Sequence, residues 1–444
     1  MAPPGSRPTR VLVGPTEVAG IAHGLCEGFT RIGVAAELVL ESSHPFAYAG
    51  AVSTSRLVRW WGHFGTLCRR LPMRRFAPKA LALVLHLLLA WPVLVHALWR
   101  YQAFVFLYGR SITNTSLELW LMRLLRKPVV VYFVGSDARP PYINGAMQGE
   151  NVARMARQTR RTKRRVRRME RGASLCINAP GTAHFHERPV VNWFAIGFPR
   201  SVHSAGESNA AAVAADATST PVVRLLHSPS QPLVKGTAQI EAAVDRLRQR
   251  GLPLELRTIS GFGNAEVIQA LRECDLVLDQ LYSDTPMAGF ATEAAQMGKP
   301  ALVGGYFASG MPNALGGQAV PPTCFVAPAD FEAALERLAR DGATRHQLGQ
   351  AAFGFVANEW ACENVAARVL RLIEGDVPAA WWFNPAEVNY LAGCGLSEDQ
   401  ARERVWRLLD HGGVQALSLA DKPALQAAFV AWAGAGPAVH GEPA

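Results

Sequence analysis

The sequence predicts an α/β protein with two domains, each built on a parallel sheet of the Rossmann type. Three observations lead to this prediction. Short apolar runs, typical of strands buried on both faces, alternate with helical segments along most of the chain. A length of 444 residues is too great for one ordinary domain. The polar, low-complexity segment Ser201–Pro221 divides the chain near its middle and is expected to be a flexible linker.

The first part of the chain opens with a strand, a turn and a helix. Strands are expected at Arg10–Gly14, Ala36–Leu40, Ala103–Tyr108, Pro128–Val134, Leu175–Asn178 and Val190–Ile196, and helices at Ala19–Ile32 and Ser116–Leu125. Gly14 and Gly20 flank the first turn and leave room for a ligand at the helix N-terminus, although a tight corner alone would also explain them. Asp137 follows the fourth strand. It either binds an acceptor hydroxyl or a donor sugar, or caps the next helix.

The segment Ala80–Trp99 holds twenty residues without a formal charge, enough to span a bilayer. We do not expect it to span, because it lies between strands of one sheet. One interpretation is a core helix in which His86 and His96 are hydrogen-bonded. The other, which we favour, is an anchor at a membrane surface. Its flank carries tryptophan and basic residues, namely Trp60, Trp61, Arg69, Arg70, Arg74, Arg75 and Lys79.

A basic helix is expected over Arg154–Arg171, and the formal net charge of the chain is +10. This run is either a solvated face or a contact for anionic headgroups or a phosphorylated lipid acceptor. We do not expect nucleic acid as a partner, because no aromatic residues interleave the arginines and no known binding motif is present.

The second part of the chain restarts the alternation of strands and helices. Strands are expected at Val222–His227, Leu254–Ser260, Leu276–Leu278, Ala301–Val303 and Phe325–Pro328, and helices at Ala265–Arg272, Thr292–Met297, Phe331–Arg340 and Glu363–Ile373. Lys235-Gly236-Thr237 follows a loop and opens a helix of about fourteen residues, an arrangement suited to phosphate. Glu293 can accept hydrogen bonds from two ribose hydroxyls, and Gly289 before it lets the backbone approach a phosphate.

These motifs together resemble the donor site of family-4 glycosyltransferases. The resemblance is carried by His227-Ser-Pro-Ser230 before Lys235-Gly236, by Asp279-Gln280, and by Glu293-Ala-x-x-x-Gly-Lys-Pro300. It implies the GT-B fold and a retaining, hexosyltransferase-type reaction without a metal or other cofactor. A nucleoside diphosphate sugar would be the donor, and a cell-surface glycan or a lipid-linked molecule the acceptor.

The resemblance also implies roles for particular residues and domains. Catalytic roles fall on Lys235, Asp137 and Asp279; donor contacts on Glu293, His227, Ser230, Gly236, Thr285 and Gly289; and acceptor-side contacts on Gly14, Gly20 and Arg139. Residues 1–200 would form the acceptor- and membrane-facing domain and residues 222–375 the nucleotide-sugar-binding domain, with 201–221 as the linker. Residues 376–444 are expected to be a small helical extension, with helix starts at Asn384, Ser397 and Asp421.

Two positions depart from the family's pattern. Val134 stands where a histidine is usual, and Thr285 stands where the first of two glutamates normally faces the transferred sugar. Either Asp279, Asp284 or the backbone amides around Gly289 replace that glutamate, or the chain is a non-catalytic nucleotide-sugar sensor or scaffold. We favour catalysis, because the ribose and phosphate positions are intact.

Cysteine usage and the N-terminus indicate the compartment. The seven cysteines are scattered without a paired motif and are expected to be free thiols in a reducing environment. The N-terminus has no apolar region typical of a secretory signal. We therefore expect a cytoplasmic protein that contacts the inner face of the cell membrane.

Overall fold

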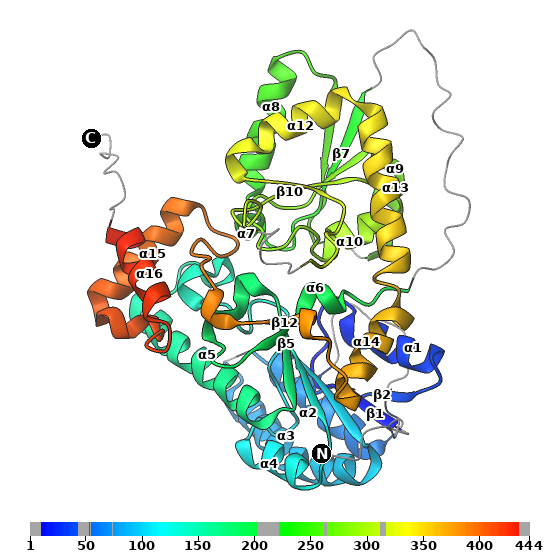
Figure 1. The fold of residues 1–444 in the computed structure, drawn as a ribbon, viewed down its shortest axis with the longest axis vertical. Coiled ribbons are helices and arrows are strands. Elements are labelled where there is room, and N and C mark those ends of the chain that lie inside the picture. The colour runs from blue at the N-terminus through cyan, green and yellow to red at the C-terminus, as the bar shows by residue number, and fades with distance from the viewer. Residues whose placement is uncertain are drawn as a thin grey trace.

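The computed structural model describes residues 10–42, 53, 55–72, 74–201, 222–261, 264–310 and 317–434. These residues form two sheets that face each other through the ends of their strands (Figure 1). The first sheet has seven strands in the order β12-β6-β5-β4-β3-β1-β2, and the second has five in the order β11-β10-β9-β7-β8. Among the described strand pairs only β12–β6 is antiparallel. The predicted GT-B architecture is confirmed.

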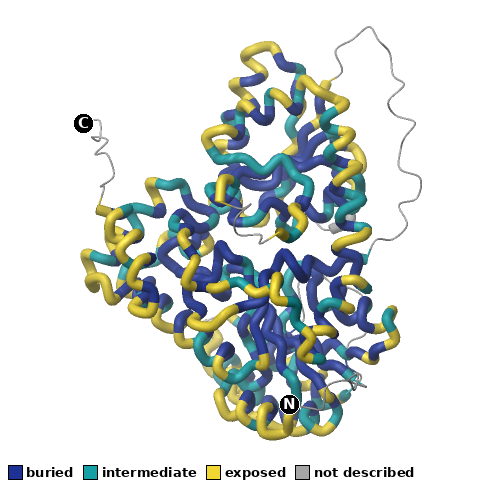
Figure 2. The backbone as a smooth tube through the Cα atoms, in the orientation of Figure 1, coloured by how far each residue is buried: buried dark blue, intermediate teal, exposed yellow. Residues whose placement is uncertain are grey.

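The first sheet is built mainly from strands that the apolar runs predicted. They are β1 (Arg10–Gly14), β2 (Ala35–Leu38), β3 (Ala103–Leu107), β4 (Val129–Tyr132), β5 (Leu175–Asn178) and β6 (Val190–Asn192). The central strands are buried on both faces, which explains why their sequences are continuously apolar (Figure 2). The last predicted strand is shorter than expected, because Asn192 caps a short helix, α6 (Trp193–Ile196).

Helices cover both faces of the first sheet. One face carries α2 (Arg56–Arg70), α3 (Phe76–Arg100), α4 (Ser116–Leu124) and α5 (Val152–Gly172), which share one hydrophobic core. The other face carries α1 (Ile21–Arg31) and α14 (Cys362–Glu374). A Cβ on Gly28 would overlap the carbonyl of Cys362, so α1 and α14 lie very close together. The last helix of the second half, α14, thus packs back on the first domain.

The second sheet is smaller and has the same layered construction. Its strands are β7 (Val223–His227), β8 (Leu254–Thr258), β9 (Leu276–Leu278), β10 (Ala301–Gly304) and β11 (Cys324–Val326). Its helices are α7 (Pro232–Lys235), α8 (Thr237–Gln249), α9 (Asn264–Glu273), α10 (Gly289–Gln296), α12 (Phe331–Arg340) and α13 (Gly342–Asn358). The sequence analysis missed α7, a single turn that begins at Pro232, and also α13.

Two chain crossings join the halves, and they run side by side. The Arg200 amide donates to the Trp360 carbonyl at 2.8 Å, and the Cys362 amide donates to the Arg200 carbonyl at 3.0 Å. A hinge between the domains would therefore bend at two hydrogen-bonded segments. Apart from Ser201, the predicted linker Ser201–Pro221 lies outside the described residues.

The C-terminal segment contains the predicted helices and also completes the first sheet. Its helices are α15 (Glu398–Gly412), which begins with the expected capping box between Ser397 and Gln400, and α16 (Pro423–Gly434). A two-residue strand, β12 (Trp382–Phe383), pairs antiparallel with β6. Arg404 of α15 donates to three backbone carbonyls of the loop after β4, which fixes α15 to the first domain.

The apolar segment 80–99 lies within α3, of which only Ala82, Ala90, Val93, Leu94 and Ala97 are buried. Among the described residues α3 is the one helix long and apolar enough to cross a bilayer by length and composition, and 28% of its most apolar window is buried. α3 is therefore not buried all round: one face packs into the core shared with α2, α4 and α5, and the other face is exposed. The strands before and after it in the chain, β2 and β3, both pair with β1 in one sheet, as the argument against a spanning helix required. His86 contacts the Trp61 carbonyl through Nδ1 at 3.1 Å.

Candidate functional site

A buried ion pair marks the carboxyl edge of the second sheet. Lys235 Nζ lies 2.7 Å from Asp279 Oδ1, just beyond β9. The side chain of Lys235 is 14% exposed and that of Asp279 is 0% exposed. Asp279 Oδ2 is buried and has no hydrogen-bond partner among the described residues. Asp279 thus lies behind Lys235 and holds its ammonium at the strand ends, where open α/β sheets bind ligands.

Lys235 is the last residue of α7, and the start of α8 two residues later is held by His227, the last residue of β7. His227 Nδ1 lies 2.7 Å from the Leu278 carbonyl, so this nitrogen donates, and Nε2 accepts from the Thr237 hydroxyl at 2.9 Å. Burial lowers the pKa of His227 and agrees with this neutral ring. Both ring nitrogens are engaged inside the domain. His227 therefore acts on the site through Thr237, the first residue of α8, and not by contacting a ligand with its ring.

Gly236 lets Lys235 and α8 approach the next loop. Its φ is +72°, in the left-handed region, and a Cβ there would lie 2.9 Å from the Cβ of Leu281. The positive φ and the close approach to Leu281 therefore account for a glycine at this position, and no bound ligand is needed to explain it. Ser230, the other loop residue predicted to contact a donor, is exposed between β7 and α7.

Glu293 lies on α10, within electrostatic reach of the ion pair. Burial raises the pKa of Glu293; Arg200 and Lys235 act in the opposite sense, and Asp279 adds to the rise. The sequence analysis did not identify Arg200, which is buried and lies at the crossing between the domains. No local motif marks Arg200, because its proximity to Glu293 arises only from the fold.

The two domains meet around these residues. A Cβ on Gly289, at the start of α10, would lie 3.9 Å from the Cβ of Ala19, which precedes α1. Arg139 Nε, in the loop after β4, donates to Asp284 Oδ2 at 3.0 Å, and Arg139 Nη2 forms an ion pair with the same oxygen. The side chains of Arg139 and Asp284 are 7% and 10% exposed. This arrangement is closed, with a buried charge pair across the domain boundary.

The loop around Thr285 is ordered by its own hydrogen bonds. Ser283 donates to the Thr285 carbonyl at 2.6 Å and accepts from Gln280 at 2.7 Å. Thr285 Oγ1 is buried and has no partner among the described residues. The carboxylate of Asp284 is engaged by Arg139, so the suggestion that Asp284 stands in for the glutamate is not supported in this closed arrangement.

Asp137 is fully buried at the end of β4. Its Oδ1 accepts from the Val134 amide at 3.0 Å, while Oδ2 has no hydrogen-bond partner among the described residues. Burial raises the pKa of Asp137 to about 6. Oδ1 therefore holds the turn after β4 together and does not cap the next helix, which begins at Pro141 without a side-chain cap, while Oδ2 stays available to another group.

A carboxylate of the chain itself lies at the first turn, where the glycines suggested room for a ligand. Glu17 folds over the start of α1, where its carboxylate accepts from the amides of Ala22 and His23 at 3.3 and 2.9 Å. In this structure the Glu17 carboxylate occupies the first amides of α1, and the acceptor-side role of Gly14 and Gly20 stays a prediction. Gly20 supplies the left-handed cap of α1, with φ +83°.

A segment of the C-terminal region also reaches this site. The Gly395 amide donates to the Tyr282 carbonyl at 2.8 Å, and the Cys394 carbonyl accepts from the Gly145 amide at 2.8 Å. Cys394 lies within electrostatic reach of Arg139, Asp284 and Lys235, and burial raises its pKa to about 11. This contact could not be predicted, since no sequence motif links residues 394–395 to the strand ends. In the described part of the chain, no group of three or more His, Cys, Asp or Glu residues could hold a metal ion.

Comparison with solved structures finds likenesses at low sequence identity. The apo structure of OtsA aligns with a TM-score of 0.50 and 12% identity, over 83% of this chain and 99% of OtsA. Anabaena HepE in complex with UDP-glucose aligns with a TM-score of 0.46 and 14% identity, over 82% and 99%. WaaG, a glycosyltransferase involved in lipopolysaccharide biosynthesis, gives 0.44 and 12%, over 82% and 99%. No protein-family model and no curated protein matches the chain. At these identities the likeness concerns the fold alone.

Proposed function

We propose that the chain is a retaining glycosyltransferase that moves a sugar from a nucleoside diphosphate to a cell-surface glycan or a lipid-linked acceptor. One observation carries the proposal. The buried Lys235–Asp279 pair lies at the carboxyl ends of the second sheet, with the Glu293 carboxylate within electrostatic reach. A cation for phosphate and a carboxylate for ribose, both at the strand ends, are the two groups that a nucleoside diphosphate requires.

The diphosphate would bind at Lys235. Asp279 holds the ammonium in place, and the first amides of α8, which begins at Thr237, add the positive end of a helix dipole. Charge on the leaving diphosphate grows as the glycosidic bond breaks. A preorganised cation therefore stabilises the transition state more strongly than the bound donor.

The ribose would bind at Glu293, and Arg200 would supply a second cation. Burial makes an ionised Glu293 costly, and two hydroxyl donors from a ribose would offset that cost. Relatives in the resembled family place an arginine shortly before the lysine, where this chain has none. Arg200 lies at the crossing between the domains, close enough for its charge to lower the pKa of Glu293. It is our candidate for the corresponding phosphate contact.

The transferred sugar would lie between the loops after β4 and β9. Each loop carries a buried oxygen without a partner among the described residues, namely Asp137 Oδ2 and Thr285 Oγ1. A buried carboxylate with one free oxygen and a raised pKa is typical of a functional group. We assign to Asp137 the contact with a sugar or acceptor hydroxyl.

Closure of the domains would exclude water from the reacting centre. The Arg139–Asp284 pair joins the loops on either side, and the paired crossings at Arg200 and Trp360 would act as the hinge. Donor entry and product release then require this pair to separate, as in other enzymes with closing domains.

A nucleotide panel tests the proposal. UDP, GDP, ADP, CMP and dTDP, together with their common sugar conjugates, are screened by thermal shift, and each conjugate that binds is then assayed for sugar release. We expect one nucleoside diphosphate to raise the melting temperature and its sugar conjugate to be turned over. Binding without any release, with or without added acceptors, would favour the nucleotide-sugar sensor instead. Absence of binding by the whole panel would contradict both.

A further inference from the structure

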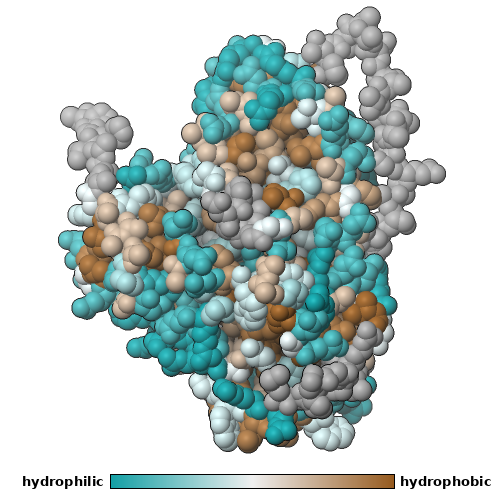
Figure 3. Space-filling model, in the orientation of Figure 1, coloured by the Kyte–Doolittle hydropathy of each residue, from teal (hydrophilic) through white to brown (hydrophobic). Residues whose placement is uncertain are grey.

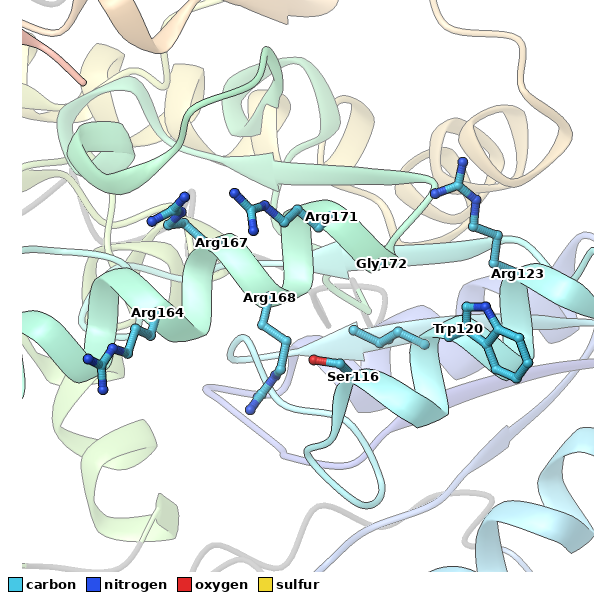
Figure 4. A pocket seen from close by; sticks show the side chains of 9 residues that line it. Ser116, Trp120, Arg123, Arg164, Arg167, Arg168, Arg171 and Gly172 are labelled. Atoms are coloured by element: carbon cyan, nitrogen blue, oxygen red, sulfur yellow. The ribbon is translucent and has the colours of Figure 1, made fainter. Parts of the chain in front are cut away.

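A second cluster of positive charge surrounds a pocket far from the strand ends. The pocket, of about 400 Å³, lies between α4 and α5. Its polar wall consists of five arginines, Arg123 from α4 and Arg164, Arg167, Arg168 and Arg171 from α5 (Figure 4). Leu119 and Trp120 of α4 form its apolar wall. The pocket is narrow because Gly172 lets the end of α5 approach α4: a Cβ there would lie 2.5 Å from the Cβ of Leu119.

The protein balances the positive charges in this pocket only in part, through Glu187 beside Arg167 and Glu118 within electrostatic reach of Arg168. Arg167 pairs with Glu187 at 3.0 Å, but among the described residues no ion pair joins the other four arginines to a carboxylate. Arg168 extends beside Ser116 at the start of α4 (Figure 4), and its Nε is buried without a hydrogen-bond partner in the described part of the chain. Burial, first of all, and the neighbouring Arg165 lower the pKa of Arg168, while the Glu118 carboxylate acts in the opposite sense. Guanidinium groups in this density suit a ligand with several anionic oxygens, such as a phosphate.

A long apolar stripe lies on a neighbouring helix. Exposed residues of α3 recur every three or four positions and so share one helix face; they are Leu81, Val84, Leu88, Trp91, Val95 and Trp99. A helix of 25 residues is roughly 38 Å long. Beside the arginine pocket, Leu117, Trp120 and Leu124 of α4 and its C-cap residue Leu125 are also exposed. Apolar surface on this scale marks an interaction site.

The stripe and the pocket belong to the same side of the molecule. Helices α3, α4 and α5 cover one face of the first sheet through one shared core, and α3 and α4 lie together at the lower end of Figure 1. Hydrophobic and hydrophilic side chains lie side by side at that end in Figure 3. Exposed basic residues lie on α2, which packs against α3, and just before α3 begins; they are Arg59, Arg70, Arg74 and Arg75. An apolar face with tryptophan and a basic rim is the composition of a surface that lies in a membrane interface.

We propose that this side of the first domain rests on an anionic membrane, with the stripe of α3 at the acyl boundary and the arginine pocket around the phosphate of a lipid headgroup. A lipid fits both features, because its phosphate matches the pocket and its acyl region matches the stripe. A soluble phosphate or a nucleic acid would leave the stripe of α3 uncovered. The surface binds lipid whether or not the chain transfers a sugar.

Vesicle co-sedimentation of the full chain tests this inference, with a matched pair of variants. The pocket variant is Arg164→Gln/Arg168→Gln/Arg171→Gln. The control, Arg157→Gln/Arg160→Gln/Arg161→Gln, removes the same charge from exposed positions of α5 outside the pocket. We expect binding to vesicles containing phosphatidylglycerol but not to pure phosphatidylcholine. The pocket variant should lose roughly thirtyfold in affinity and the control at most about threefold, since charges away from the surface contribute less. Leu81→Ser/Leu88→Ser should also weaken binding, with melting temperatures unchanged.

Four results would overturn the inference. Equal losses in the pocket variant and the control would mean general charge attraction without a headgroup site. Pocket-dependent binding of inorganic phosphate or glycerol phosphate, without vesicle binding, would assign the pocket to a soluble ligand. Pocket-dependent binding of single-stranded RNA that is tighter than vesicle binding would assign it to nucleic acid. A dimer that Leu81→Ser/Leu88→Ser dissociates, without vesicle binding, would assign the stripe to a second copy of the chain.

Discussion

Replacing Lys235 has two consequences, which a double-mutant cycle separates. The ammonium lies 2.7 Å from Asp279, whose side chain is fully buried. Lys235→Met therefore leaves an uncompensated carboxylate in the interior, and breaking a buried pair in this way costs about 3–5 kcal/mol of folding stability. Lys235→Met/Asp279→Asn removes both charges and should recover most of that loss. Urea denaturation of the wild type, both single variants and the double variant measures this coupling.

In the double variant we expect folding stability to recover but turnover to stay low. If Lys235 stabilises the leaving diphosphate, its charge is absent in the double variant as well. We expect kcat/KM for the donor identified in the nucleotide panel to stay roughly a hundredfold or more below wild type, about 3 kcal/mol. Lys235→Arg should recover only part of the rate, because a planar guanidinium does not replace a point charge. Recovery of both stability and turnover in the double variant would refute the reasoning and leave Lys235 as a structural partner of Asp279.

Three further predictions concern the groups around this pair. Glu293→Gln should weaken nucleoside diphosphate binding by roughly 1.5–3 kcal/mol in a calorimetric titration, and unchanged affinity would remove it from the ribose site. Asp137 has a pKa raised to about 6, so the folded state holds its proton more tightly and wild-type stability falls as pH rises from about 4 to 6. Asp137→Asn should therefore raise the unfolding free energy by about 1–3 kcal/mol at pH 8 and leave it unchanged below about pH 4; a pH-independent difference would contradict this cause. Asp284→Asn and Arg139→Gln should each destabilise by about 3 kcal/mol and together by less than the sum, whereas additive losses would mean that the pair does not couple the domains.

The sequence predicted the features that depend on local patterns. The central strands were predictable because burial on both faces requires continuous apolar runs, as in β3 and β4. Lys235 and Glu293 could be predicted from the strand and helix that surround each of them. Lys235 stands two residues before α8, and Glu293 lies within the short helix α10. The same reasoning failed for α13, whose three glycines and irregular apolar spacing hide its helical period.

Contacts between distant segments were beyond local patterns. Arg139 and Asp284 are 145 residues apart, and nothing in either loop indicates the partner. Arg200 lies close enough to Glu293 for their charges to interact only because the chain crosses between the domains at that point. The strand β12 has two residues, too few for any periodicity. The carboxylate of Glu17 competes with a ligand for the start of α1, and only the folded turn reveals this competition.

The central claim is that one nucleoside diphosphate binds between Lys235 and Glu293 at the carboxyl edge of the second sheet. Calorimetric titration of UDP, GDP, ADP, CMP and dTDP into the wild type, Glu293→Gln and Lys235→Met/Asp279→Asn tests it most directly. We predict that one of these nucleotides binds the wild type and loses at least about tenfold in affinity in each variant, the scale of a lost charged hydrogen bond. Binding that is equally tight in all three proteins would contradict the claim.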